Sequence, residues 1–112
     1  PHPLLPDAPL KMAAEGSGLA DLFNAVQLEV SGAQLSAASL ANDVAGLPQV
    51  VRRRDLLIAY PYTNTLTVLR ITGAVLRQAM ERSAAYFTRG EDNTLRVSDC
   101  FLEPKVEHYN YD

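Results

Sequence analysis

The sequence is poor in the side chains that most often bind metal ions or act as nucleophiles. It contains two histidines, His2 and His108, and one cysteine, Cys100. No H-x-H, H-E-x-x-H or C-x-x-C spacing occurs, and there is no G-x-S-x-G segment or glycine-rich phosphate loop. A lone cysteine forms no internal disulfide and is most simply a small buried hydrophobe, although a spatial pair with His108 stays open. The sequence therefore predicts no catalytic residue and no metal ligand in this chain.

Positive charge and long apolar runs are also scarce. The formal net charge is -3 and the isoelectric point is about 5.3, whereas a protein that binds nucleic-acid polymers needs a basic face. No apolar run approaches the roughly 20 residues that cross a bilayer, so we expect no membrane span within this segment. With 112 residues, 47% of them hydrophobic, the chain fits one compact domain. Because the first residue is Pro1 and not methionine, we expect a chain processed or cut from a longer protein.

Proline dominates the N-terminal stretch. Positions 1, 3, 6 and 9 are all proline, and proline continues neither a helix interior nor a central strand. We therefore expect residues 1–14 to be a linker or an extended arm, with the folded domain over 15–112.

A first helix is predicted over residues 18–30. Ser17 is a candidate N-cap and Gly32 a candidate C′ residue, and the apolar residues between them recur at helical spacing. The apolar positions are Leu19, Leu22, Phe23, Val26 and Val30, and the opposite face, which we expect to be solvated, holds Asp21, Asn24, Gln27 and Ser31.

Two weaker elements follow. Residues 33–40 are small and apolar with interspersed serines, which favours a closely packed strand over a short helix. Residues 50–59 are typical of a short helix that carries three arginines in its first turn, the unfavourable end for positive charge. The arginines, residues 52–54, either meet a partner or phosphate or form a solvated helix face.

The second half alternates between strand and helix signals. Residues 66–71 are rich in β-formers and apolar on both faces except at Arg70, which predicts a strand. Thr72 is a candidate N-cap for a second helix, in which Arg77 and Glu81 form an i,i+4 pair. The apolar stripe of this helix holds Leu76, Ala79, Met80, Ala84 and Phe87.

The chain after this helix contains a turn over 90–93 and a strand over 95–101, followed by Pro104 and a second tyrosine pair, Tyr109 and Tyr111. These elements together predict an α+β fold in which a mixed sheet packs against helices.

Tyr60 and Tyr62 flank Pro61 directly before the predicted strand. Because residues i and i+2 of an extended chain lie on the same face, both rings are expected to project together. A tyrosine ring can stack on a flat ligand such as a nucleobase. From the spacing alone, packing of both rings in the interior remains the alternative.

The order of these segments resembles the C-terminal domain of the 5′-nucleotidase family, over about residue 15 to the end of the chain. The resemblance is carried by Tyr60-Pro61-Tyr62-Thr63-Asn64-Thr65-Leu66, by Ile71-Thr72-Gly73-Ala74 with the helix that follows, and by His108-Tyr109-Asn110-Tyr111-Asp112. It is closest to the bacterial branch of bifunctional 2′,3′-cyclic-nucleotide 2′-phosphodiesterases and 3′-nucleotidases, whose signature Tyr-Asn-Phe-Asp is similar to the last of these segments.

The resemblance implies that catalysis and substrate binding are carried out by different domains. In such enzymes an N-terminal metallophosphatase domain with a divalent metal pair cleaves the phosphoester, and the C-terminal domain binds the nucleoside. By this resemblance Tyr62 would be one of two rings that sandwich the base, with Asn42 and Asn64 as further substrate-binding residues. The fragment itself would hold no cofactor, its partners would be a nucleotide or nucleoside and the missing catalytic domain, and the parent would be periplasmic, secreted or at the cell surface.

The sequence departs from the family pattern in three places. Thr63 stands where Asp or Glu is common, and Ala41-Asn42-Asp43 stands where Phe-Asn-Pro is common. By the resemblance, the segment that supplies the second stacking ring would lie beyond Asp112. The alternative from another functional class is a small module without enzymatic activity whose exposed aromatic residues meet protein or carbohydrate.

Overall fold

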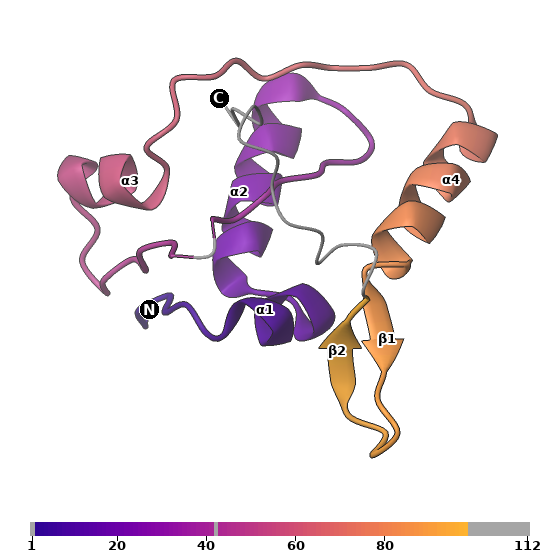
Figure 1. Ribbon diagram of the computed structural model, residues 1–112. Coiled ribbons are helices and arrows are strands. Elements are labelled where there is room, and N and C mark those ends of the chain that lie inside the picture. The colour runs from indigo at the N-terminus through magenta and orange to yellow at the C-terminus, as the bar shows by residue number, and fades with distance from the viewer. Residues whose placement is uncertain (1, 42, 99–112) are drawn as a thin grey trace, which may run out of the picture. The chain divides into compact units, whose positions relative to one another are not determined.

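The computed structural model describes residues 2–41 and 43–98, and the chain divides into two compact units, Pro1–Leu69 and Arg70–Asp112. The first unit contains α1 (Pro9–Glu15), α2 (Gly18–Ser31) and α3 (Arg53–Ala59), and the second contains α4 (Gly73–Ala84), β1 (Phe87–Arg89) and β2 (Leu95–Val97), as Figure 1 shows. Helices together with a small sheet confirm the α+β fold class. In the described residues the sheet is one antiparallel pair of strands.

The ends of α2 follow the capping residues of the sequence. The Ser17 hydroxyl accepts a hydrogen bond from the Leu19 amide at 3.3 Å. Gly32 has a left-handed backbone with φ of 67°, and its amide donates to the carbonyl of Leu28 at 2.9 Å. Glycine adopts this conformation without steric cost, so the helix ends where its sequence predicts.

One side of α2 that the sequence assigns to solvent is half-buried. The hydroxyl oxygen of Ser36 lies 2.8 Å from Oδ1 of Asn24 and 2.7 Å from Oε1 of Gln27. A hydroxyl has a single hydrogen, so it donates to one of these amides at a time. Predicting a solvated face at Asn24 and Gln27 is therefore wrong, because the segment that follows the helix folds back and covers both side chains.

The outward face of α2 is correspondingly apolar. The exposed fractions are 36% for Leu22, 50% for Val26 and 74% for Val30. Only Leu19 and Phe23 of the predicted stripe point to the interior, where Leu19 is fully buried and Phe23 packs against the core. The prediction of a helix is confirmed, but the buried face of α2 is shifted away from the apolar stripe, toward the side that carries Asn24 and Gln27.

The core of the first unit is small. Its buried members are Leu19, Val44, Leu47 and Ala59, and the partly buried Leu4, Met12, Phe23 and Leu40 pack against them. Residues 33–40, where a strand is expected, form no regular element. The core is thus closed by loops and by short helices and not by a sheet.

The N-terminal residues contribute to this unit. Leu4 and Leu47 form an antiparallel bridge, with amide-to-carbonyl distances of 2.9 and 2.8 Å. A Cβ at Gly46 would lie 2.6 Å from the carbonyl oxygen of Leu4, so the bridge requires glycine there. Residues 9–14 of the expected extended arm belong to the helix α1, which starts at Pro9, a position at which the missing amide hydrogen costs nothing.

The helix α3 begins three residues later than the sequence indicates. Oδ2 of Asp55 accepts a hydrogen bond from the amide of Arg52 at 2.8 Å, which makes Arg52 the N-cap. The carboxylate of Asp55 therefore fixes the start of the helix, and Val50 and Val51 remain outside it.

Residues 61–72 have no regular secondary structure, and all of them are exposed. The prediction of a strand over 66–71 is wrong for this structure. A strand is defined by hydrogen bonds to a neighbour, and among residues 2–41 and 43–98 only β1 and β2 pair as strands. The β-forming side chains of this segment therefore line an extended chain without a sheet.

The second unit starts with the helix that the sequence predicts best. The Thr72 hydroxyl accepts a hydrogen bond from the Val75 amide at 3.3 Å, and Nε of Arg77 lies 3.9 Å from Oε1 of Glu81. The apolar stripe of α4 stays on the surface, since none of its residues is buried. The stripe also ends earlier than expected, because Phe87 belongs to β1.

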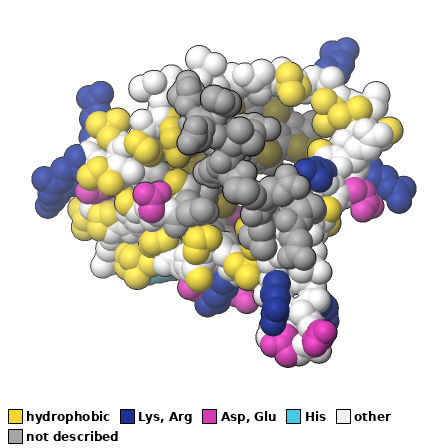
Figure 2. Space-filling view, in the orientation of Figure 1, with side chains coloured by type: hydrophobic (Ala, Val, Ile, Leu, Met, Phe, Trp, Pro, Cys, Tyr) yellow, Lys and Arg dark blue, Asp and Glu magenta, His cyan; other side chains and the backbone are white. Residues whose placement is uncertain are grey.

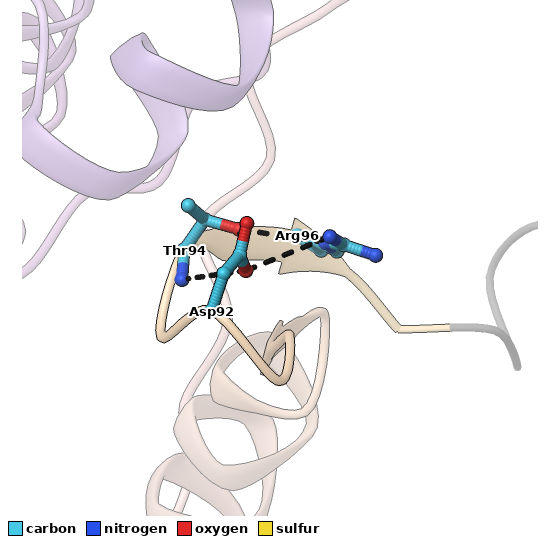
Figure 3. A network of polar contacts seen from close by, with 3 residues as sticks. All are labelled: Asp92, Thr94 and Arg96. Atoms are coloured by element: carbon cyan, nitrogen blue, oxygen red, sulfur yellow. Dashed lines mark hydrogen bonds and ion pairs between the residues drawn. The ribbon is translucent and has the colours of Figure 1, made fainter.

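A β-hairpin follows α4, with Phe87 opposite Val97 and Arg89 opposite Leu95. Its turn is held by a polar network that Figure 3 shows: Oδ1 of Asp92 accepts hydrogen bonds from the amide and the hydroxyl of Thr94 at 3.2 and 2.6 Å and lies 3.5 Å from Nη2 of Arg96. These bonds, first of all the one from the Thr94 hydroxyl, lower the pKa of the Asp92 carboxyl below its usual 3.8. The predicted turn is confirmed, and the described part of the predicted strand over 95–101 is β2.

Candidate functional site

Three aromatic rings of the first unit form a connected group, which we call the aromatic cluster: Phe23, Tyr60 and Tyr62. The ring centroids of Phe23 and Tyr60 are 5.4 Å apart with an interplanar angle of 67°, and those of Tyr60 and Tyr62 are 5.6 Å apart at 87°. Edge-to-face pairs of this kind contribute about 0.5–1.5 kcal/mol beyond the burial of area. Tyr60 therefore connects a core residue to the outermost ring, Tyr62.

The position of the aromatic cluster follows from the end of α3. Ala59 is 4% exposed and belongs to the core, which anchors the chain directly before the two tyrosines. Tyr60 is the C-cap, and its amide donates to the carbonyl of Leu56 at 2.9 Å. Pro61 then keeps the chain out of the helix, so Tyr60 and Tyr62 project to the same side, as their spacing predicts.

Asn64 is joined to the aromatic cluster through Tyr60. The phenol hydroxyl of Tyr60 donates a hydrogen bond to Oδ1 of Asn64 at 3.1 Å. Both Tyr62 and Asn64 therefore lie beside Tyr60. The structure thus brings together two of the three side chains that we expect to bind substrate.

Tyr62 is the open end of the aromatic cluster. Its exposed fraction is 51%, whereas Tyr60 and Phe23 are half-buried. The alternative in which both tyrosines pack in the interior thus fails for Tyr62. A half-exposed ring that forms an edge-to-face pair with one neighbour can stack on a flat ligand.

Sequence reasoning did not assign Phe23 to this site. Its only sequence signal is its place on the helical spacing of Leu19, which indicates core and not contact with a loop about 37 residues further along the chain. The contact depends on how α2 and α3 pack, which periodicity alone does not give.

Some residues of interest lie outside the part of the chain that the structure describes. Of the expected substrate-binding residues this applies to Asn42, and it applies as well to Cys100, His108, Tyr109 and Tyr111, which were not assigned to the site. The contribution of Asn42 to substrate binding therefore stays a prediction.

An apolar groove of about 380 Å³ runs along α4 in the second unit. It is lined by Gly73, Leu76, Arg77, Met80, Glu81 and Ala84. None of the predicted substrate-binding residues lines it, and its polar groups, Arg77 and Glu81, are already opposed to each other. We therefore place the candidate site at the aromatic cluster and not in this groove.

The described residues contain neither a candidate metal site nor a candidate membrane span. Within residues 2–41 and 43–98, no group of three or more His, Cys, Asp or Glu side chains lies close enough to hold a metal ion. In the same residues, every helix is too short or too polar to cross a bilayer.

Tyr62 is thus a half-exposed ring in contact with Tyr60, whose hydroxyl donates to the amide oxygen of Asn64. Residues 7–108 match the family described as 5′-nucleotidase, C-terminal domain. Because the match spans most of the chain, the chain belongs to this family. No curated protein and no solved structure matches it.

Proposed function

We propose that this chain is the nucleoside-recognition part of a metal-dependent nucleotide phosphoesterase and that Tyr62 stacks on the base of the substrate. The family supports a role in a nucleotidase. The observation that carries the assignment to Tyr62 is its 51% exposure together with its edge contact to Tyr60. In this proposal Tyr60 supports the ring of Tyr62, and the exposed part of that ring would meet the planar ligand.

Stacking on one ring gives weak but measurable affinity. Base stacking on an aromatic side chain contributes about 1–3 kcal/mol. With the other face of the base in water, the contribution falls at the low end of this range, about 1 kcal/mol or roughly a fivefold change in Kd. The complete enzyme would gain the remainder from a second ring and from phosphate contacts outside this chain.

The polar edge of the base or the ribose would meet Asn64 and Asn42. One end of the Asn64 amide is engaged by the Tyr60 hydroxyl, and an amide has a second end with the opposite hydrogen-bonding character. A Tyr60→Phe substitution would release Asn64 and leave both rings in place, so its effect on affinity separates the contribution of the amide from that of stacking.

The chemical step would take place in another domain. An N-terminal metallophosphatase domain would supply the divalent metal pair, and the described residues of this chain offer no cluster of ligands for it. The substrate class that we propose within the family is 2′,3′-cyclic nucleotides and 3′-nucleotides, and the location is periplasmic, secreted or at the cell surface. Both refinements rest on the order of the sequence segments around Tyr62.

A titration of the full chain with adenosine, followed by nuclear magnetic resonance, tests this function. We expect millimolar affinity with shifts confined to the surroundings of Tyr62, a loss of about fivefold in Tyr62→Ala and near wild-type affinity in Tyr62→Phe, because stacking needs the ring and not the hydroxyl. Ribose and a panel of sugars serve as control ligands. Equal affinities in wild type and Tyr62→Ala, or shifts with sugars alone, would defeat the assignment and favour a carbohydrate-binding module.

A further inference from the structure

The outward face of α2 forms a surface that we call the acidic stripe. Leu22, Val26 and Val30 follow each other at intervals of four residues and are exposed by 36%, 50% and 74%. Asp21 and Glu29 lie beside this ridge, eight residues apart with Ala25 between them, and are exposed as well. Residues four apart lie on the same side of a helix, so an apolar ridge runs along α2 next to a negatively charged one.

A second surface of the same unit has the opposite charge, and we call it the basic patch. It consists of residues 50–58, in which Val50, Leu57 and Ile58 are exposed by 73%, 63% and 61%. Arg53 is exposed, and the side chain of Arg54 is 70% exposed, with only a 3.9 Å contact to Asp55. Figure 2 shows dark blue side chains next to yellow ones at the left edge of the view, where α3 lies in Figure 1.

Local folding explains neither the positive charges nor the exposed apolar side chains of the basic patch. Positive charges in the first turn of a helix oppose the helix dipole by about 0.3–1 kcal/mol each, so Arg53 and Arg54 cost α3 stability. Large apolar side chains exposed side by side are likewise typical of a surface that contacts a partner. The acidic stripe likewise exposes large apolar side chains side by side, most of all Val30.

We infer that the basic patch binds the acidic stripe of a second copy of this chain. Arg53 and Arg54 would face the row of Asp21 and Glu29, and the apolar side chains of the two surfaces would cover each other. The opposite charges of the two surfaces are the ground for this choice of partner.

Association of this kind is heterologous, because two different surfaces meet. Heterologous contacts repeat from copy to copy and give rings or chains. Both surfaces lie in the unit Pro1–Leu69, so the inference holds irrespective of nucleotide binding and of the second unit.

Two charge-reversal variants test the inference by analytical ultracentrifugation of the full chain. Arg53→Glu with Arg54→Glu reverses the basic patch and relieves the helix dipole of α3. Ala25→Lys with Glu29→Lys reverses the acidic stripe and leaves Asp21 at the helix start. For wild type we expect an average mass that rises between about 10 µM and about 1 mM and falls when salt is increased from about 0.05 M to about 0.5 M.

Each variant alone should associate at least about tenfold more weakly than wild type, because like charges then face each other. An equimolar mixture of the two should associate again, since each intact surface meets its complement. The control Arg70→Glu with Arg77→Glu changes the net charge as the first variant does but lies outside both surfaces, and it should associate like wild type.

Three results would overturn the inference. The first is a wild-type chain that stays monomeric over the whole concentration range, and the second is a mixture of variants that fails to restore association. The third is a lower melting temperature of the Ala25→Lys and Glu29→Lys variant at unchanged mass, because the acidic stripe would then be covered by its own chain.

Discussion

Replacing Phe23 by leucine should loosen the aromatic cluster without opening a cavity in the core. Phe23 is half-buried and packs against the core residues while its ring meets Tyr60 at a centroid distance of 5.4 Å. Leucine retains most of the apolar contact, and it has no ring to form the edge-to-face pair. The substitution thus isolates the support that the core gives to the loop 60–64.

The magnitude follows from the geometry of the pair. An edge-to-face pair at this distance contributes about 0.5–1.5 kcal/mol, and a change between large apolar side chains of similar volume adds less than about 1.5 kcal/mol. We expect the free energy of unfolding of the first unit to fall by about 1 kcal/mol, which is roughly a fivefold change in the unfolding equilibrium. The ring protons of Tyr62 should shift at the same time, because Tyr60 loses one of the contacts that orient it.

Urea unfolding followed by the amide resonances of α2 measures this effect for the first unit alone. The matched control is Phe87→Leu, which removes an equivalent pair, since the rings of Tyr86 and Phe87 are 5.2 Å apart at 90°. Phe23→Leu should destabilise α2 and move the Tyr62 resonances, whereas Phe87→Leu should leave both unchanged. Identical behaviour of the two variants, or unshifted Tyr62 resonances in Phe23→Leu, would refute the role of Phe23 as a support.

Three further predictions concern other parts of the chain. Gly32→Ala should lower stability by roughly 1 kcal/mol, because φ is 67° there. Gly73→Ala should raise stability, since Gly73 is a helical position surrounded by open space. Thermal unfolding measures both changes, and changes of the same sign would contradict the backbone argument. The pKa of Asp92 is lowered in the folded hairpin. The bond to Thr94 therefore contributes stability at pH values above the unfolded pKa near 3.8, and this contribution is lost as the pH falls through the lower folded pKa. The amide shift of Thr94 should report this step, and Asp92→Asn should abolish it. The chain alone should not hydrolyse bis(p-nitrophenyl) phosphate with manganese or zinc, as the described residues contain no cluster of metal ligands, and turnover by the pure chain would disprove this.

Local signals in the sequence predict helix ends well in this protein. Ser17, Gly32 and Thr72 act through bonds to residues no more than four positions away, so the sequence contains both partners of each bond. The turn over 90–93 belongs to the same class, because Asp92 and Thr94 are neighbours. The fold class and the family follow from the order of such segments.

The buried face of a helix and the pairing of strands are less predictable from the sequence, because the residues that they contact are distant along the chain. The buried side of α2 includes Asn24 and Gln27, which lie within hydrogen-bonding distance of Ser36, a residue beyond the end of the helix. A β-forming composition over 66–71 gives no strand without a neighbour to bond to. At the candidate site, the spacing of Tyr60 and Tyr62 predicts that their rings project together, but the support from Phe23 requires the tertiary structure.

The extended chain over 61–72 has a practical consequence for handling the protein. Proteases bind substrates as exposed, irregular backbone, and nicking concentrates at such sites. Every residue in this stretch is exposed, and the boundary between the two units falls within it, after Leu69. Brief digestion should therefore cut here first and release an N-terminal piece that keeps Tyr62 and a C-terminal piece that keeps α4 and the hairpin.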